Sequence, residues 1–180
     1  PRRGRVLDHV NLTAFPGQVT AVVGRSGSGA TTLLRCLAQA LPAGAQGLGQ
    51  LLWRGRDLSA HDTRGLLVVA DWAITPVTVA AHLRSLTSKV LDTAQRLGLA
   101  EVLGRRLSQL PADLLARIHL ASLALAPAAG LVLVDSVSTA ATGEDRKAIA
   151  SALRRRAEAG AVVLWADHDL DSVWEHADRL

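Results

Sequence analysis

The sequence predicts an α/β fold with a mostly parallel β-sheet covered by helices. Short, continuous apolar runs rich in valine and leucine alternate with longer segments of helical spacing, which is typical of strands buried on both faces. Three of these runs end on residues suited to a ligand site: Gly24, Asp135 and the pair Asp167–His168. In a parallel sheet the ligand lies beyond the carboxyl ends of the strands, so these residues are expected to converge.

The N-terminal quarter predicts strands and one helix. Residues 5–15 alternate between apolar and polar, which indicates a strand ending at the turn Pro16–Gly17. Residues 18–24 form an apolar, β-branched run that predicts a buried strand, and residues 31–40 have helical spacing. Residues 50–55 predict a short strand and turn, so a small antiparallel β region is expected near the N-terminus.

The middle of the chain is mostly helical. Residues 65–70 predict another buried strand, after which residues 77–110 take a helical pattern with regularly spaced leucines. A further helix is expected over 114–126. We therefore expect a short helical insert, a subdomain over about 71–126, within a single domain that spans residues 1–180.

The C-terminal third returns to strands and helices in alternation. Residues 131–135 form a buried strand that ends on an acid. Thr142 is a suitable N-cap for a helix that runs to Glu158, with Gly160 as its stop. Residues 161–166 predict the last strand, and a helix is expected from about residue 169.

Composition narrows the class of protein. The 180 residues and the 49% hydrophobic content are enough for one folded domain and exclude disorder. The net charge of +4 comes from arginines scattered among acids, so nucleic acid is not the favoured partner. A single cysteine, Cys36, forms no internal disulfide and fits a reducing compartment. No apolar run reaches the roughly 20 residues of a spanning helix, and a chain that starts at Pro1 is expected to be a fragment of a longer one.

The stretch GRSGSGATT has the plan of a phosphate-binding loop, because it stands between a predicted strand and a predicted helix. Its glycines let several backbone N–H groups point at one place, and the helix N-terminus adds positive potential. The expected fold is therefore the P-loop NTPase fold. The candidate nucleotide-binding residues are Gly24, Arg25, Ser26, Gly27, Ser28, Gly29, Ala30, Thr31 and Thr32.

Ala30 stands where such a loop carries a lysine. A hydrogen bond to a charged group contributes about 1.5–3 kcal/mol, so its loss predicts binding weakened roughly ten- to hundredfold rather than abolished. Arg25 could replace part of the missing charge.

Magnesium and catalysis involve the other strand ends. Thr31 and Asp135 are the expected Mg²⁺ ligands, since a hydroxyl and a carboxylate are hard oxygen donors. Ser136 stands where a carboxylate would polarise the attacking water, and serine is no general base at neutral pH. His168 could contact a γ-phosphate.

Whole segments resemble one family in the right order. The stretch from Val6 to Leu37, the segments TPVTVAAHL and LVLVDSVSTAAT, and the C-terminal VLWADHDLDSVWEHADRL are similar to the ATP-binding cassette domain of ABC transporters. The resemblance implies ATP and Mg²⁺ as cofactors and a retained switch histidine at His168. It also implies that Ser136 occupies the catalytic glutamate position.

The departures from that family are as consistent as the match. By resemblance, Ala30 replaces the loop lysine, Ala70 the glutamine of the glutamine loop, and Thr142 the aspartate of the D-loop. The signature falls on LPADL, residues 110–114, where Pro111 lacks an N–H and Asp113 adds negative charge. The resemblance implies that ATP lies between two chains, held by the phosphate loop of one and the signature of the other. Both halves of such a site are thus expected to be impaired in this chain.

Three functions remain open. The first is a cassette domain that binds Mg-ATP weakly, hydrolyses it little or not at all, and works with a second cassette, preferably a different chain, and a transmembrane permease domain. It would lie in the cytoplasm, peripheral to the inner face of the cell membrane. The second is a working ATPase in which Arg25 or a partner supplies the missing groups. The third is a non-enzymatic interaction module on a decayed cassette scaffold; action on nucleic acid is a weaker fourth.

Overall fold

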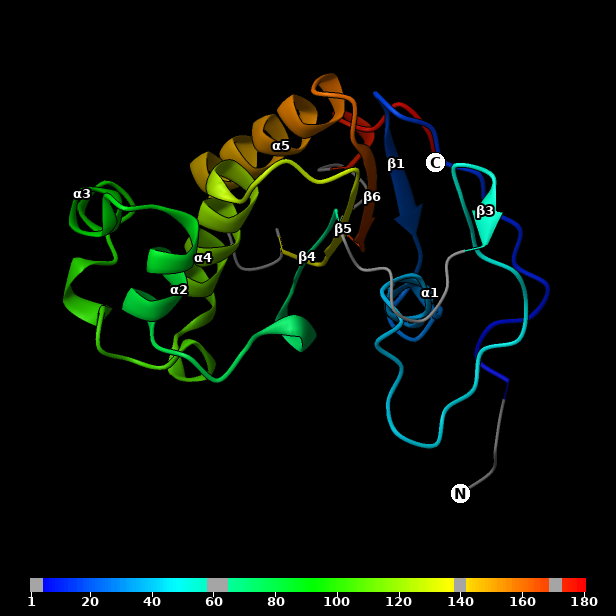
Figure 1. The fold of residues 1–180 in the computed structure, drawn as a ribbon, viewed down its shortest axis with the longest axis horizontal. Helices are drawn as coiled ribbons and strands as arrows, with labels where there is room; N and C mark the ends of the chain where they lie inside the picture. Colours follow the sequence, from blue (N-terminus) through cyan, green and yellow to red (C-terminus); the bar gives the residue numbers. More distant parts are fainter. Residues whose placement is uncertain (1–4, 58–64, 138–141, 169–172) are drawn as a thin grey trace.

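The computed structural model describes residues 5–57, 65–137, 142–168 and 173–180. Within them a four-stranded parallel sheet carries helices on both faces, which confirms the predicted α/β class (Figure 1). The strand order is β1-β6-β5-β4. The strands are β1 Val19–Val23, β4 Leu66–Ala70, β5 Leu131–Asp135 and β6 Val162–Asp167.

The sheet is buried on both faces because successive side chains of each strand point to opposite sides. In β5, Leu131 and Leu133 pack in a cluster with Leu34, on the side of the first helix. Val132 and Val134 pack in the other cluster, with the longer helices. The first helix is α1 Ala30–Leu37, which covers one face of the sheet. The longer helices, α4 Ala112–Leu125 and α5 Gly143–Glu158, cover the other (Figure 1). A continuous apolar strand is therefore what this position requires.

The helical pattern over 77–110 is divided into short pieces. They are α2 Val79–Leu86, α3 Val90–Arg96, and the 3₁₀ turns η2 Ala100–Val102 and η3 Leu107–Gln109. Thr78 caps α2 through its hydroxyl, which accepts from the Ala81 N–H at 3.2 Å. Gly98, with φ 64°, follows the end of α3 and turns the chain. Buried apolar side chains, among them Leu99 and Leu107, join these pieces to α4 in one small core.

Two helix boundaries follow the sequence signals. Thr142 caps α5 as predicted, since its hydroxyl accepts from the Asp145 N–H at 3.2 Å, and Gly160 follows with φ 91°. By contrast, α1 ends at Leu37 instead of the predicted residue 40, because Gln39 takes φ 55° and leaves the helical conformation.

Arg156 of α5 closes the C-terminal end of α4. Its guanidinium donates to the carbonyl oxygens of Leu123 at 2.7 Å, Ala126 at 2.5 Å and Pro127 at 2.8 Å. The last carbonyls of a helix have no intrahelical partner, and the helix dipole favours a cation there. This side chain thus adds a polar link between two long helices that also pack in one apolar cluster.

The C-terminal segment lies along the outer edge of β1. Arg179 bridges to Thr20 in parallel pairing, and the Val19 N–H donates to the Asp178 carboxylate at 2.7 Å. Arg154 also donates to Asp178, at 2.9 Å and 3.0 Å. The pKa of Asp178 is lowered: the Val19 N–H has the largest effect, burial opposes it, and Arg154 lowers the pKa further.

The N-terminal β region is smaller than predicted. β2 Leu52–Trp53 and β3 Arg56–Asp57 pair antiparallel, as expected near residues 50–55. The strand predicted over 5–15 is wrong, because His9 takes φ 48° and interrupts the extended backbone. The helix start expected near residue 169 lies outside the described residues. Among the described helices, none combines the length and apolarity that crossing a bilayer demands.

Candidate functional site

The glycine-rich loop, residues 24–29, connects β1 to α1 at the carboxyl edge of the sheet, and residues 25–28 are exposed. The chain turns at Gly27 and Gly29 with φ values of 84° and 98°, which residues with a side chain rarely adopt. α1 starts at Ala30 with no side-chain cap, and the N–H groups of a first helical turn have no intrahelical partner. Loop and helix start therefore present backbone donors suited to an anion.

Packing fixes the shape of this loop at two glycines. A Cβ at Gly24 would strike the side chain of Ser28. A Cβ at Gly29 would lie 2.8 Å from Leu7 Cδ2 and 3.3 Å from the Val6 carbonyl oxygen. The N-terminal segment thus packs against the loop, a contact that the local sequence pattern does not indicate.

The expected metal ligands lie on the same side of the sheet. Thr31 is exposed in the first turn of α1, and Asp135 ends β5 with 6% of its surface exposed. A hydroxyl and a carboxylate fit Mg²⁺, which takes few protein ligands when phosphate oxygens and water complete its octahedron. The described residues hold no group of three or more His, Cys, Asp or Glu able to bind a metal by themselves.

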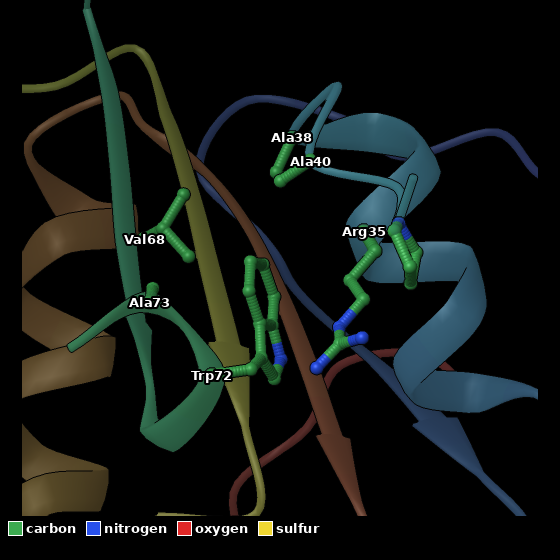
Figure 2. Close-up of a pocket in the computed structure, with 7 residues that line it drawn as sticks. Arg35, Ala38, Ala40, Val68, Trp72 and Ala73 are labelled. Atoms are coloured by element: carbon green, nitrogen blue, oxygen red, sulfur yellow. The ribbon is translucent and has the colours of Figure 1, made fainter. Parts of the chain in front are cut away.

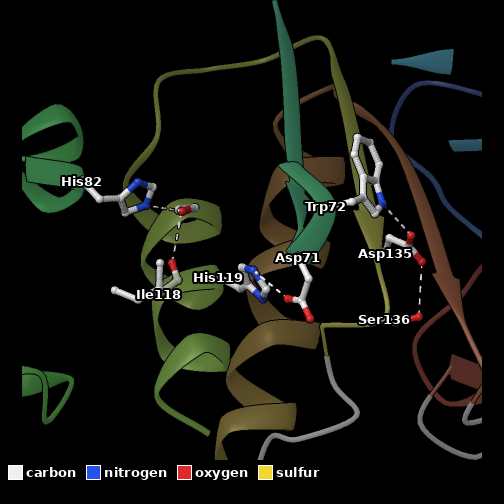
Figure 3. Close-up of polar contacts among 8 residues, drawn as sticks. Asp71, Trp72, His82, Ile118, His119, Asp135 and Ser136 are labelled. Atoms are coloured by element: carbon white, nitrogen blue, oxygen red, sulfur yellow. Dashed lines mark hydrogen bonds and ion pairs between the residues drawn. The ribbon is translucent and has the colours of Figure 1, made fainter. Parts of the chain in front are cut away.

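Both carboxylate oxygens of Asp135 accept hydrogen bonds from the protein (Figure 3). The indole N–H of Trp72 donates to Oδ2 at 2.7 Å, and the Ser136 hydroxyl donates to Oδ1 at 3.2 Å. Ser136 is held in the left-handed region, with φ 52°, and its N–H donates to the Ala166 carbonyl at 2.8 Å. Each oxygen of the expected metal ligand therefore already accepts one hydrogen bond from a side chain of its own chain.

His168 directly follows β6, the strand between β1 and β5. Its side chain is half exposed, and its N–H donates to the buried Asp167 carboxylate at 2.8 Å. The Trp165 indole donates to the same carboxylate at 3.2 Å. The predicted site residues after β1, β5 and β6 thus lie at the ends of three neighbouring strands.

A buried polar cluster lies behind the end of β4. Ser122 donates its hydroxyl proton to the Ile118 carbonyl at 3.1 Å, so His82 must carry a proton on Nε2 to bond Ser122 Oγ at 2.8 Å. Burial lowers the pKa of His82. Burial, and next the neighbouring His82, lower the pKa of His119 to about 4, so its 3.5 Å contact with Asp71 is not an ion pair at pH 7.

Asp71 begins the 3₁₀ turn η1 Asp71–Ala73, directly after β4. Desolvation, and next the negative charge of Asp135, raise its pKa. A pocket of about 220 Å³ adjoins this turn, and Ala70, at the expected glutamine position, lines it without a polar side chain. His82, His119 and Ser122 also line it.

Trp72 is the site residue that sequence reasoning missed. It belongs to no motif, and its hydrogen bond reaches a residue 63 positions away. The signal available was an indole placed two residues beyond a buried strand, at the edge where ligands bind.

The comparisons with known proteins agree on one family. Residues 7–139 match the family model described as ABC transporter. The chain is 32% identical to a zinc import ATP-binding protein of Cereibacter sphaeroides, over 99% of this chain and 74% of that one. It is 30% identical to a probable anion import ATP-binding protein of Haloferax volcanii, over 98% and 71%.

Solved structures show the same fold. An ATP-binding subunit of an ABC transporter superposes with a TM-score of 0.71 at 18% identity, over 99% of this chain and 79% of the other. A nucleotide-free ATP-binding cassette gives 0.70 at 17% identity, over 98% and 80%.

Proposed function

This chain belongs to the ABC transporter family, as an ATP-binding domain, and on that premise we propose that it binds Mg-ATP weakly and hydrolyses it slowly or not at all. The observation that carries the proposal is the pairing of an exposed glycine-rich loop with a carboxylate, Asp135, whose oxygens are already hydrogen-bonded.

Weak binding follows from Ala30. The backbone donors of residues 24–29 and the start of α1 supply an anion cradle without a side-chain cation at the usual position. Thr31 and Asp135 would hold Mg²⁺, which would neutralise part of the phosphate charge when bound. A lysine ammonium at this position would contribute about 1.5–3 kcal/mol to binding. Without it, we expect the affinity for ATP to be reduced roughly ten- to hundredfold.

Slow hydrolysis follows from Ser136. Its hydroxyl donates to Asp135 instead of accepting a proton from water. The loss of a general base costs roughly 10²–10⁴ in rate. The side chain of His168 is half exposed, so it is accessible to a γ-phosphate. Among the described residues, it is the one that we propose for this contact.

The partner proposals rest on the start of α4. Pro111 is its N-cap and gives no N–H, and Asp113 lies in the first turn, where a carboxylate satisfies the helix dipole. An anionic phosphate is thus disfavoured at this end of α4. A pair of identical chains would have two such impaired sites, which supports pairing with a different, intact cassette.

The cellular role is proposed from the relatives. Their names describe import ATP-binding proteins, so we propose an import system with a membrane permease partner and a position at the cytoplasmic face of the membrane. We also propose that residues 71–126 form a helical subdomain, since their short helices share one core with α4.

The test is isothermal titration of ATP into the chain, with Mg²⁺ and with EDTA, together with a phosphate-release assay. We expect weak binding and turnover far below that of an intact cassette. Turnover at an ordinary rate that Asp135→Asn abolishes would refute the impaired hydrolysis. In that case Arg25→Ala tests the alternative of a working ATPase, since Arg25 is exposed in the loop.

A further inference from the structure

Trp72 has a position that no motif accounts for. It lies in the turn after β4, and its indole N–H donates to Asp135 Oδ2 at 2.7 Å (Figure 3). Asp135 is almost fully buried, with 6% exposed, so few directions of approach to its oxygens remain. The indole takes one of them.

The face of the Trp72 ring contacts α1, the helix that follows the glycine-rich loop. The Arg35 guanidinium of α1 lies over the Trp72 ring, 5.2 Å from its centre. Both side chains line a pocket of about 340 Å³ between α1 and the end of β4, together with Val68 and Ala73 (Figure 2). The indole therefore has both a holding contact and adjoining space to move into.

The chemistry makes indole and metal competitors. An indole N–H only donates, and a water bound to Mg²⁺ also donates to the carboxylate that holds it. Asp135 is 6% exposed, so few of its lone pairs are accessible to a second donor. Oδ1 accepts from Ser136 and Oδ2 from Trp72, and of these two donors the indole is the one that lines a pocket it can move into.

We propose that Trp72 is a latch on Asp135, which holds this carboxylate in the metal-free state and must leave it when Mg-nucleotide binds. This rests on the proposed binding of Mg-ATP. The latch opposes Mg²⁺ and not the nucleotide itself, since the loop backbone is unchanged by it. Trp72 acts through Asp135 and is a positioning residue.

The experiment is isothermal titration of ATP into the whole chain, in Mg²⁺ and in EDTA, for the wild type and Trp72→Phe. Phenylalanine keeps an aromatic ring beneath Arg35 and removes the five-membered part of the indole with its N–H. Trp165→Phe is the matched control, because it removes an indole hydrogen bond from a different buried carboxylate, Asp167.

In Mg²⁺ we expect Trp72→Phe to bind ATP roughly tenfold or more tightly than the wild type, the effect of one hydrogen bond to a charged group. In EDTA the two should agree within about twofold, and Trp165→Phe should keep the wild-type ratio between the two conditions. Arg35→Ala, which frees the ring and leaves the indole in place, should change the ratio in the same direction and serves if Trp72→Phe does not fold.

Two outcomes separate the claims. If all variants bind ATP with one Mg²⁺-to-EDTA ratio, the latch is refuted while nucleotide binding stands. If no variant binds ATP in either condition, the proposed function fails and the latch fails with it.

Discussion

Replacing Arg156 by alanine should destabilise the fold far more than replacing its exposed neighbour Arg155. The Arg156 guanidinium makes three hydrogen bonds to carbonyl oxygens at the end of α4, between 2.5 and 2.8 Å. The group is only half buried, so we count about 1 kcal/mol for each bond rather than the higher value for a buried charge. The expected loss is about 3 kcal/mol, a large part of the roughly 5–15 kcal/mol of a typical domain.

Urea denaturation followed by circular dichroism measures this loss as a change in the free energy of unfolding. Arg155→Ala is the matched control, because Arg155 is the neighbouring exposed residue, and it should change stability by less than about 0.5 kcal/mol. Arg156→Lys keeps the charge but not the three-pronged geometry, and should lose about 2 kcal/mol. Equal midpoints for Arg156→Ala and Arg155→Ala would refute the reasoning.

Three further predictions concern pH and nucleotide. Asp178 has a lowered pKa, so the stability it adds through the Val19 N–H and Arg154 is full above the unfolded pKa of about 4 and is lost as the pH falls through the folded value. The difference in unfolding free energy between wild type and Asp178→Asn should therefore shrink between pH 6 and about pH 3, and a constant difference would contradict this. His119 has a pKa near 4 when folded, so its burial costs stability progressively as the pH falls from about 6.5 towards 4; His119→Gln should flatten that part of the stability profile, and an unchanged slope in urea titrations would argue against it. Ala30→Lys should tighten ATP binding roughly ten- to hundredfold by isothermal titration, whereas Ala30→Met, an unbranched side chain of nearly the same length without charge, should not.

The sequence predicted most of the sheet because its strands are buried on both faces. Residues 131–135 are apolar up to a terminal acid, and the observed strand has those bounds. The bounds of α5 were equally predictable from the sequence. The Thr142 side chain caps its N-terminus and Gly160 ends it with a positive φ, and both effects are local.

Elsewhere local pattern was insufficient. Leucine spacing over 77–110 indicated helix but not its division, which depends on turns such as that at Gly98. The alternation over 5–15 resembled a strand, yet a strand needs a neighbour, and Val6 and Leu7 pack on the loop at Gly29 instead.

The candidate site was predicted as a set of strand ends, and its assigned roles remain predictions. The contacts that alter those roles join residues far apart in sequence. The hydrogen bond from Trp72 to Asp135 spans 63 positions, and no periodicity encodes such a pairing. Polar groups that satisfy one another across the fold are visible only in three dimensions.

The pairing of Arg179 with Thr20 has a practical consequence for handling this protein. An unpaired outer strand invites other molecules to add to it and aggregate. The residues after Ala177 shield β1 from such addition. Trimming them, or pulling them away with a bulky fusion, should lower solubility even though every core side chain stays in place.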